Sequence, residues 1–320
     1  MQNIILFVLS IALLCSCGNN SYKEKKESQG TDIKYDFNVL FVPDLSNRIN
    51  LSIHPKPIHD TTLLYHILDN VVQLIDLNNR KVKQADIYKF DFVNKSILSK
   101  GICIPEQMII DLSRFGNKVQ EEAVYLRDSI SNDIRKFKDN IGRVYDYSLT
   151  HTAGADLWNY FNETINSSLK RDEVIVQKNK KNNITKKYKD VVVVLTDGYI
   201  ENSNKAEGYK LDQQLIEKIR KDFITSGSKD LSEFIRSKET YQIIPTTNKL
   251  TGVNVLVLEL IDRSLDKNGV ALKQPTDFQI MKVVWEEWLK NSGAQNVEIH
   301  QSVIMKDDGF KILKKFMEKI

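Results

Sequence analysis

Short apolar runs that alternate with longer amphipathic stretches are the feature that most constrains this chain. Asp190–Leu195 (DVVVVL) and Val253–Ile261 (VNVLVLELI) are almost continuously apolar, which is typical of strands buried on both faces of a parallel sheet. Further strands are expected at Asn38–Val42, Ala85–Val93, Gly101–Ile104 and Val297–Val303, and helices at Thr61–Leu77, Gln120–Ile141, Leu211–Phe223, Asp230–Ser237, Phe278–Asn291 and Gly309–Ile320. This alternation predicts an α/β domain with a doubly wound, mostly parallel, Rossmann-like sheet and helices on both faces.

The first sixteen residues have the composition of an export signal. They carry no charged side chain, and the apolar run Ile4–Cys15 is too short to span a bilayer as a permanent helix. The run closes with Leu14-Cys15-Ser16-Cys17, which resembles the lipobox of bacterial lipoproteins. The resemblance implies cleavage before Cys17, attachment of lipid to that cysteine, and residence in the cell envelope on the periplasmic or cell-surface face. It leaves open which membrane and which face.

The rest of the chain divides into a linker and one long domain. Residues 17–36 are polar, charged and poor in branched apolar side chains, which predicts a flexible tether. Residues 37–320 then form the predicted domain, with insertions at about 170–189 and 201–248 that lack the alternating pattern. A core of this size needs no disulfides. The processed chain would in any case retain only Cys103 besides the lipidated residue.

The charge balance excludes one class of partner. The 46 basic and 42 acidic residues leave a formal net charge of only +4. We therefore expect no nucleic-acid binding. A modest positive bias could favour an anionic membrane surface.

Polar side chains follow two of the predicted buried strands directly. Asp44, Ser46 and Arg48 come after the first strand, and Thr196-Asp197-Gly198 comes after the strand that ends at Leu195. Ligands of open parallel sheets bind beyond the carboxyl ends of the strands. Carboxylate and hydroxyl oxygens gathered there are the ligands that Mg²⁺ prefers.

These residues give the chain a resemblance to the von Willebrand factor A (vWA) domain family. The family binds a divalent cation through Asp-x-Ser-x-Ser after the first strand, a Thr in a middle loop, and an Asp after the fourth strand. Asp44, Ser46 and Asp197 match three of these positions, and Gly154–Phe161 resembles the middle loop. Over about residues 37–320, the resemblance implies a vWA-like fold and a metal-ion-dependent adhesion site that holds Mg²⁺ or Mn²⁺.

Two departures put the cation in doubt. Arg48 stands where the family has its second serine, and Ala155 stands where it has its threonine, although Thr150 and Thr152 lie just upstream. A guanidinium cannot ligate a cation and brings a positive charge of its own, so Arg48 could sit between Asp44 and Asp197 in place of the metal. The alternatives are that Arg48 points outward and a cation binds, or that hydrogen bonds alone hold the site.

Signals of catalysis are weak. The sequence contains no glycine-rich phosphate loop, no nucleophile elbow and no metalloprotease motif. His54, His59, Asp60 and His66 cluster near one predicted helix start, but their spacing matches no usual zinc pattern and predicts surface positions. We therefore expect no enzyme.

The expected function is that of a membrane-anchored, vWA-like module that binds a partner protein through Asp44, Ser46 and Asp197. One alternative is a metal-free structural component of an envelope complex, with the insertions making the contacts. A metal-dependent hydrolase is a second alternative, and His151 or Asp156 are the residues that would serve as its general base. The partner and the oligomeric state cannot be read from the sequence.

Overall fold

The computed structural model describes residues 31–80, 83–93, 96–151, 154–170, 175–178, 183–201 and 208–320. Within them the chain forms a seven-stranded sheet in the order β3-β2-β1-β5-β6-β7, with β4 pairing to β5 beside this path. The strands are β1 (Thr31–Pro43), β2 (Ile87–Phe90), β3 (Ile109–Asp111), β4 (Ile175–Lys178), β5 (Asn183–Leu195), β6 (Val253–Leu260) and β7 (Asn296–Gln301). The β2–β3 and β4–β5 pairs are antiparallel and the others are parallel. The prediction of an α/β fold with a mostly parallel sheet is confirmed.

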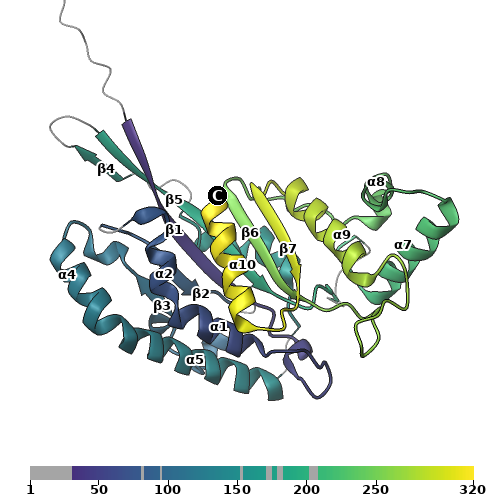
Figure 1. The fold of residues 1–320 in the computed structure, drawn as a ribbon, viewed down its shortest axis with the longest axis horizontal. Coiled ribbons are helices and arrows are strands. Elements are labelled where there is room, and N and C mark those ends of the chain that lie inside the picture. Colours follow the sequence, from purple (N-terminus) through teal and green to yellow (C-terminus); the bar gives the residue numbers. More distant parts are fainter. Residues whose placement is uncertain are drawn as a thin grey trace, which may run out of the picture.

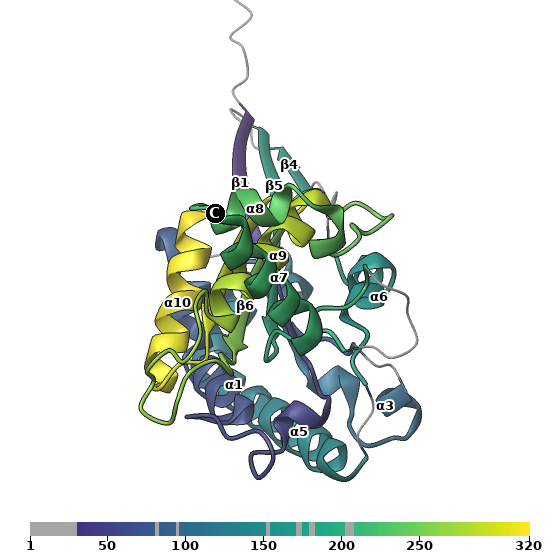
Figure 2. The ribbon, with the colours of Figure 1, turned by 90° about the vertical axis from the view of Figure 1, so that its right-hand side faces the viewer.

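Helices cover both faces of this sheet (Figures 1 and 2). They are α1 (Asp60–Asp69), α2 (Val71–Ile75), α3 (Ser96–Ser99), α4 (Val119–Val124), α5 (Ile130–Thr150), α6 (Leu157–Asn162), α7 (Gln213–Ser226), α8 (Leu231–Arg236), α9 (Asp277–Asn291) and α10 (Lys306–Lys319). Side chains alternate between the faces of a strand. Accordingly Val39 and Phe41 of β1 join α1, α2, α5 and α10 in one core, whereas Leu40 and Val42 join α6, α7 and α9 in the other.

Most of the predicted elements lie within a few residues of their expected positions, and three do not. The helix expected over Thr61–Leu77 is divided at Asn70 into α1 and α2. The helix expected over Gln120–Ile141 contains a π-helical turn at Tyr125–Ser129 and continues to Thr150. The strand proposed at Gly101–Ile104 is wrong, because the short edge strand β3 lies further along the chain.

The amino-terminal boundary of the domain also needs correction. Residues 31–36, predicted to be part of the tether at 17–36, form the first half of β1, where Thr31 pairs with Asn183 and Asp36 with Tyr188. The partner residues come from the predicted insertion at 170–189, of which residues 183–189 form the first half of β5. Pairing between these two polar segments satisfies their backbone groups, and an apolar pattern does not reveal it. Residues 1–30, which include the predicted signal peptide and Cys17, lie outside the described residues.

The second insertion, at about 201–248, contributes α7 and α8, close to the helices expected there. Both pack beside α9 at one end of the molecule (Figure 1). In the part of the chain that the structure describes, no helix combines the length and the apolar character that crossing a bilayer requires.

Candidate functional site

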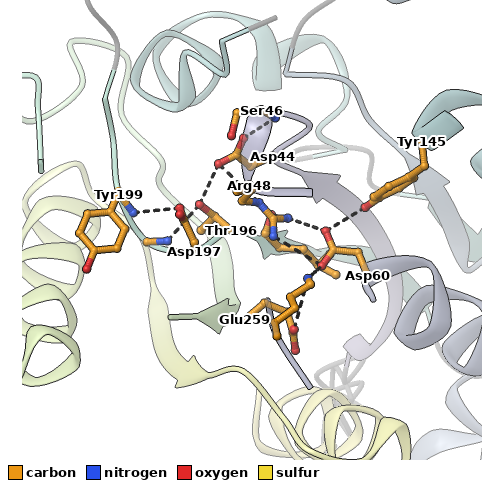
Figure 3. Close-up of polar contacts among 12 residues, drawn as sticks. Asp44, Ser46, Arg48, Asp60, Tyr145, Thr196, Asp197, Tyr199 and Glu259 are labelled. Atoms are coloured by element: carbon orange, nitrogen blue, oxygen red, sulfur yellow. Dashed lines mark hydrogen bonds and ion pairs between the residues drawn. The ribbon is translucent and has the colours of Figure 1, made fainter. Parts of the chain in front are cut away.

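The carboxyl ends of β1 and β5 bring Asp44 and Thr196 side by side. Pro43 pairs with Leu195, and the Asp44 amide donates to the Leu195 carbonyl at 2.8 Å. The Thr196 hydroxyl donates to Asp44 Oδ2 at 3.0 Å, while Asp44 Oδ1 accepts the Ser46 amide at 2.9 Å. Asp44 and Thr196 are buried, and Ser46 is half-buried at the mouth of the site. The structure therefore gathers these residues at one edge of the sheet (Figure 3).

Asp197 reaches the same edge from the turn after β5. Its carboxylate accepts the Tyr199 amide at 3.3 Å and the Nη2 of Arg263, from the loop after β6, at 2.9 Å. The Arg263 guanidinium lies 3.8 Å from the centre of the Tyr199 ring, a cation–π geometry that fixes its position. Burial, and then the nearby negative charge of Asp44, raise the pKa of Asp197, against the opposing effect of Arg48 and Arg263. The surroundings of Asp197 therefore disfavour the ionised form of its carboxyl group.

Arg48 points inward and is only 4% exposed. Its Nε lies 3.6 Å from Asp44 Oδ2, while its Nη2 donates to Asp60 and to the Leu195 carbonyl. The alternative that Arg48 points outward is wrong. The placement between Asp44 and Asp197 also needs correction, because the closest carboxylate is Asp60 at the start of α1. The reason is the short helical turn Asn47–Ile49, which directs the side chain toward that helix.

Asp60 is the centre of a buried charge network. Besides Arg48 it accepts the Tyr145 hydroxyl at 3.1 Å and contacts the Lys56 ammonium. Burial alone would raise the pKa of Asp60, but Arg48 and Lys56 outweigh it and hold that pKa well below its ordinary value. The sequence predicts a surface position for Asp60, together with the histidine cluster. Its 1% exposure corrects that prediction.

The network ends on Glu259, near the end of β6. Its carboxylate lies 3.6 Å from Lys56 Nζ and accepts the Ser302 hydroxyl at 3.0 Å. Glu259 is fully buried, burial raises its pKa, and its φ of 73° lies in the left-handed region. Residues other than glycine that are held in this strained backbone region are concentrated at functional sites.

His59 and His66 of the predicted cluster have separate structural roles. His59 caps α1 by accepting the Thr61 amide at 3.2 Å, and His66 contacts Asp307 at 2.9 Å. Among the described residues no group of three or more His, Cys, Asp or Glu side chains is arranged to hold a metal ion.

The middle loop supplies no hydroxyl ligand within the described residues. Asp156 caps α6 by accepting the Asn159 amide at 2.9 Å, and the Thr150 hydroxyl donates to the Tyr147 carbonyl at 3.1 Å. The exposed His151 stacks on Tyr147 with ring centres 4.1 Å apart. Thr152 lies outside the described residues. His151 and Asp156 thus have structural roles here, and neither role supports the hydrolase hypothesis.

The side chains present do not fit a divalent cation. The buried Arg48 Nε lies 3.6 Å from Asp44 without a hydrogen bond of its own, and Arg263 donates to one oxygen of Asp197. A cation between the two aspartates would meet two guanidinium charges, which offer no lone pair. The sequence did not identify Asp60, Arg263 or Glu259 as part of this site. Arg263, like Asp197, follows the end of a buried strand. This position was the one feature of the sequence that could have identified it.

No protein-family model matches the chain, and no curated protein matches it.

Proposed function

We propose that this chain is a membrane-anchored, vWA-like module that binds a partner protein through the crevice at the carboxyl edge of its sheet, without a bound metal ion. Apart from the added hairpin strand β4, the order of the strands corresponds to the 3-2-1-4-5-6 order of doubly wound sheets. In such sheets the ligand binds beyond the carboxyl ends of the two adjacent strands, here β1 and β5, from which the chain continues toward opposite edges of the sheet. Asp44, Thr196 and Asp197 stand at this position.

The observation that carries the proposal is a set of exposed apolar side chains at the carboxyl edge of the sheet. Because β1, β6 and β7 are parallel, the loops that follow them all leave the same edge of the sheet (Figure 1). Each loop exposes two large apolar side chains, and their exposed fractions range from 39% to 77%. These six residues, the apolar rim, are Leu51, Ile53, Val270, Leu272, Ile304 and Met305. Several exposed apolar side chains in loops at one edge of a domain are typical of a protein interface.

Arg263 and Tyr199 fit the same function. Arginine and tyrosine are enriched among the residues that dominate binding energy at interfaces. The Arg263 side chain is 34% exposed, so that its guanidinium, fixed on Tyr199 and Asp197, remains accessible to an acidic group of the partner. In this proposal the guanidinium takes the role that a cation has in the family.

The direction of β1 supports the proposed anchorage. Thr31 begins β1 at the amino edge of the sheet, and Asp44 follows the strand at the carboxyl edge. A lipid on Cys17 would therefore connect to the edge opposite the crevice. The rim would face away from the membrane of the cell envelope, where a partner can reach it.

Site-specific photo-crosslinking in intact cells tests this function. A photoreactive amino acid at Ile53 or Ile304 should yield the same crosslinked species, whereas one at Val124 of α4, which is 48% exposed, should not. Replacing Arg263 with Gln should reduce the yield from both rim positions. Crosslinking that is equal at Val124 would contradict the proposal.

The same experiment distinguishes this function from the alternative of a structural component of an envelope complex. Ile224 is 62% exposed on α7, and it lines a groove with Phe223, Leu231 and Phe278 between the insertion and α9. A crosslink from Ile224, with none from Ile53 or Ile304, would favour a structural component whose insertion makes the contacts. A chelator should leave the yield at the rim unchanged if no cation takes part.

A further inference from the structure

The amino ends of β1 and β5, with the antiparallel strand β4 beside β5, project beyond the helical layers at the edge of the sheet opposite Asp44 and Asp197 (Figures 1 and 2). In this projection Tyr35 of β1 pairs with Lys187 of β5, and Phe37 pairs with Lys189. Because paired residues of parallel strands point to the same face, Tyr35, Lys187 and Lys189 share one face of the projection, whereas Lys34 points to the other face. The Lys189 ammonium lies 4.4 Å from the centre of the Tyr35 ring. Lys34 and Lys187 are exposed, and Tyr35 is 40% exposed.

Two described carboxylates near this projection already have partners within the chain. Asp36 lies 3.3 Å from Lys186 and 3.5 Å from Arg80. Asp190 accepts the Asn38 side-chain amide at 2.6 Å and the Lys170 backbone amide at 2.9 Å. Within the described ranges, no ion pair involves Lys34 or Lys187. Their charge is therefore available to a partner outside the chain.

Lys187 and Tyr35 also line a groove at this edge. The groove runs between the middle of β5 and the amino end of β6, and its other lining residues include Tyr188, Lys189, Thr251, Gln295 and the buried Asp190. Lysine ammonium groups beside tyrosine rings and neutral polar groups suit the headgroup region of a bilayer. There an amphipathic ring lies at the level of the headgroups, and a lysine pairs with phosphate.

We infer that this amino-edge surface, formed by Lys34 on one face of the projection and by Tyr35, Lys187 and Lys189 on the other, rests on a bilayer of anionic phospholipid. The choice of a membrane as occupant rests on the anchorage proposed above. Cys17 precedes Thr31 by 14 positions, and a chain of that length reaches at most about 50 Å. A lipid on Cys17 therefore keeps the surface within reach of the headgroups, which raises its effective concentration there. The surface fixes the orientation of the domain, and the crevice points away from the membrane.

Vesicle binding without the lipid anchor tests the inference. The buried core lies between Phe37 and Met317, so a chain of residues 18–320 contains all of it. This chain should sediment with phosphatidylcholine vesicles that contain phosphatidylglycerol and not with pure phosphatidylcholine vesicles, and salt should weaken the binding. Each lysine at an anionic surface contributes about a fivefold change in affinity. The double variant Lys34→Gln/Lys187→Gln should thus bind about 25-fold more weakly.

Matched variants exclude a nonspecific effect of charge. Lys267→Gln/Lys306→Gln removes two exposed lysines from the opposite edge and should leave binding unchanged. Lys34→Arg/Lys187→Arg should bind like the unmodified chain. Equal binding to both kinds of vesicle, or equal losses in the two Gln variants, would overturn the inference. Because neither the lipid anchor nor a partner protein is present, such a result would leave the crosslinking test of the crevice unaffected.

Discussion

Arg48 and Asp60 form a buried ion pair in which Nη2 lies 2.5 Å from Oδ2 and neither side chain is more than 3% exposed. The pair joins the turn after β1 to the first residue of α1 and, through Lys56, to Glu259 of β6. Buried ion pairs are costly to desolvate, and removing one partner leaves an uncompensated charge. The network therefore fixes the geometry beneath the crevice and makes it sensitive to single substitutions.

Replacing Asp60 with Asn should destabilise the protein in a pH-dependent way. The pKa of Asp60 is depressed in the folded state, so its ionised form stabilises the fold above the unfolded pKa of about 4, and this contribution is lost as the pH falls below that value. At neutral pH the variant should lose about 3 kcal/mol of unfolding free energy. The loss should shrink when urea unfolding is repeated at about pH 4 and below.

The exposed pair of Asp69 and Lys138 provides the control for this measurement. Their charged atoms are 2.9 Å apart, but the Asp69 side chain is 52% exposed. Asp69→Asn should change the unfolding free energy by less than about 1 kcal/mol at any pH. If the Asp60→Asn difference stayed constant across pH, the ion pair would not be the source of the stability.

Gly198 closes the turn that carries Asp197, and we expect it to tolerate no side chain. Its φ is 92°, and an added Cβ would lie 2.8 Å from Leu260 Cγ and 2.9 Å from Met281 Sδ. Gly198→Ala should therefore cost about 3 kcal/mol or more, combining backbone strain with overpacking. Gly227 has a φ of 67° but an open site, so Gly227→Ala should cost only about 1 kcal/mol. Equal losses in thermal unfolding would show that the close packing around Gly198 has no effect.

The central strands could be predicted because strands buried on both faces have continuous apolar sequences. The runs Asp190–Leu195 and Val253–Ile261 are apolar whatever their neighbours, and the polar residues that follow the strands could be placed at one edge from topology alone. The edge strand β3 has three residues and the projecting half of β1 is polar. Neither segment has a continuous apolar sequence, because both are strands only through pairing with a segment that is distant in the chain.

The charge network was harder to predict for a related reason. Whether Arg48 faces Asp44, Asp197 or Asp60 depends on the path of one short turn, and all three carboxylates are compatible with the sequence. Arg263 lies 66 residues from Asp197 in the chain, and only the pairing of β5 with β6 brings them together. Residue types at strand ends identified the location of the site, whereas its partners required the three-dimensional structure.

The lipid anchor leads to a prediction that does not depend on the crevice. Cys17→Ala should prevent lipid attachment and processing by the lipoprotein pathway, because the thioether forms at that sulfur. In cells, the unmodified chain should partition into the detergent phase with a mass that corresponds to cleavage before residue 17, and the variant should do neither. Ser16→Ala keeps a small residue at the cleavage position and should be processed normally. A Cys17→Ala protein that is cut at the same place and still partitions with detergent would exclude the lipobox interpretation.

Arg48→Ser should turn a metal-independent site into one that responds to a cation. The substitution leaves Asp44 and Asp60 without their guanidinium, which should destabilise the chain by about 3–5 kcal/mol. It also introduces the serine that the family has at this position. Mg²⁺ or Mn²⁺ should then raise the melting temperature of the variant and hardly that of the unmodified chain, since only a ligand of the folded state stabilises it.

The variant Arg48→Ala distinguishes the loss of the guanidinium charge from the gain of a hydroxyl ligand, because it removes the same charge without adding a hydroxyl. If the hydroxyl completes the site, the Ala variant should respond to the cation less than the Ser variant, and adding Asp197→Ala to Arg48→Ser should abolish the response. An unmodified chain that Mg²⁺ stabilises strongly would mean that Arg48 does not substitute for the cation. If all the variants ignored millimolar cation, the crevice would be held by hydrogen bonds and ion pairs alone. Partner recognition would then depend on Arg263 and the apolar rim.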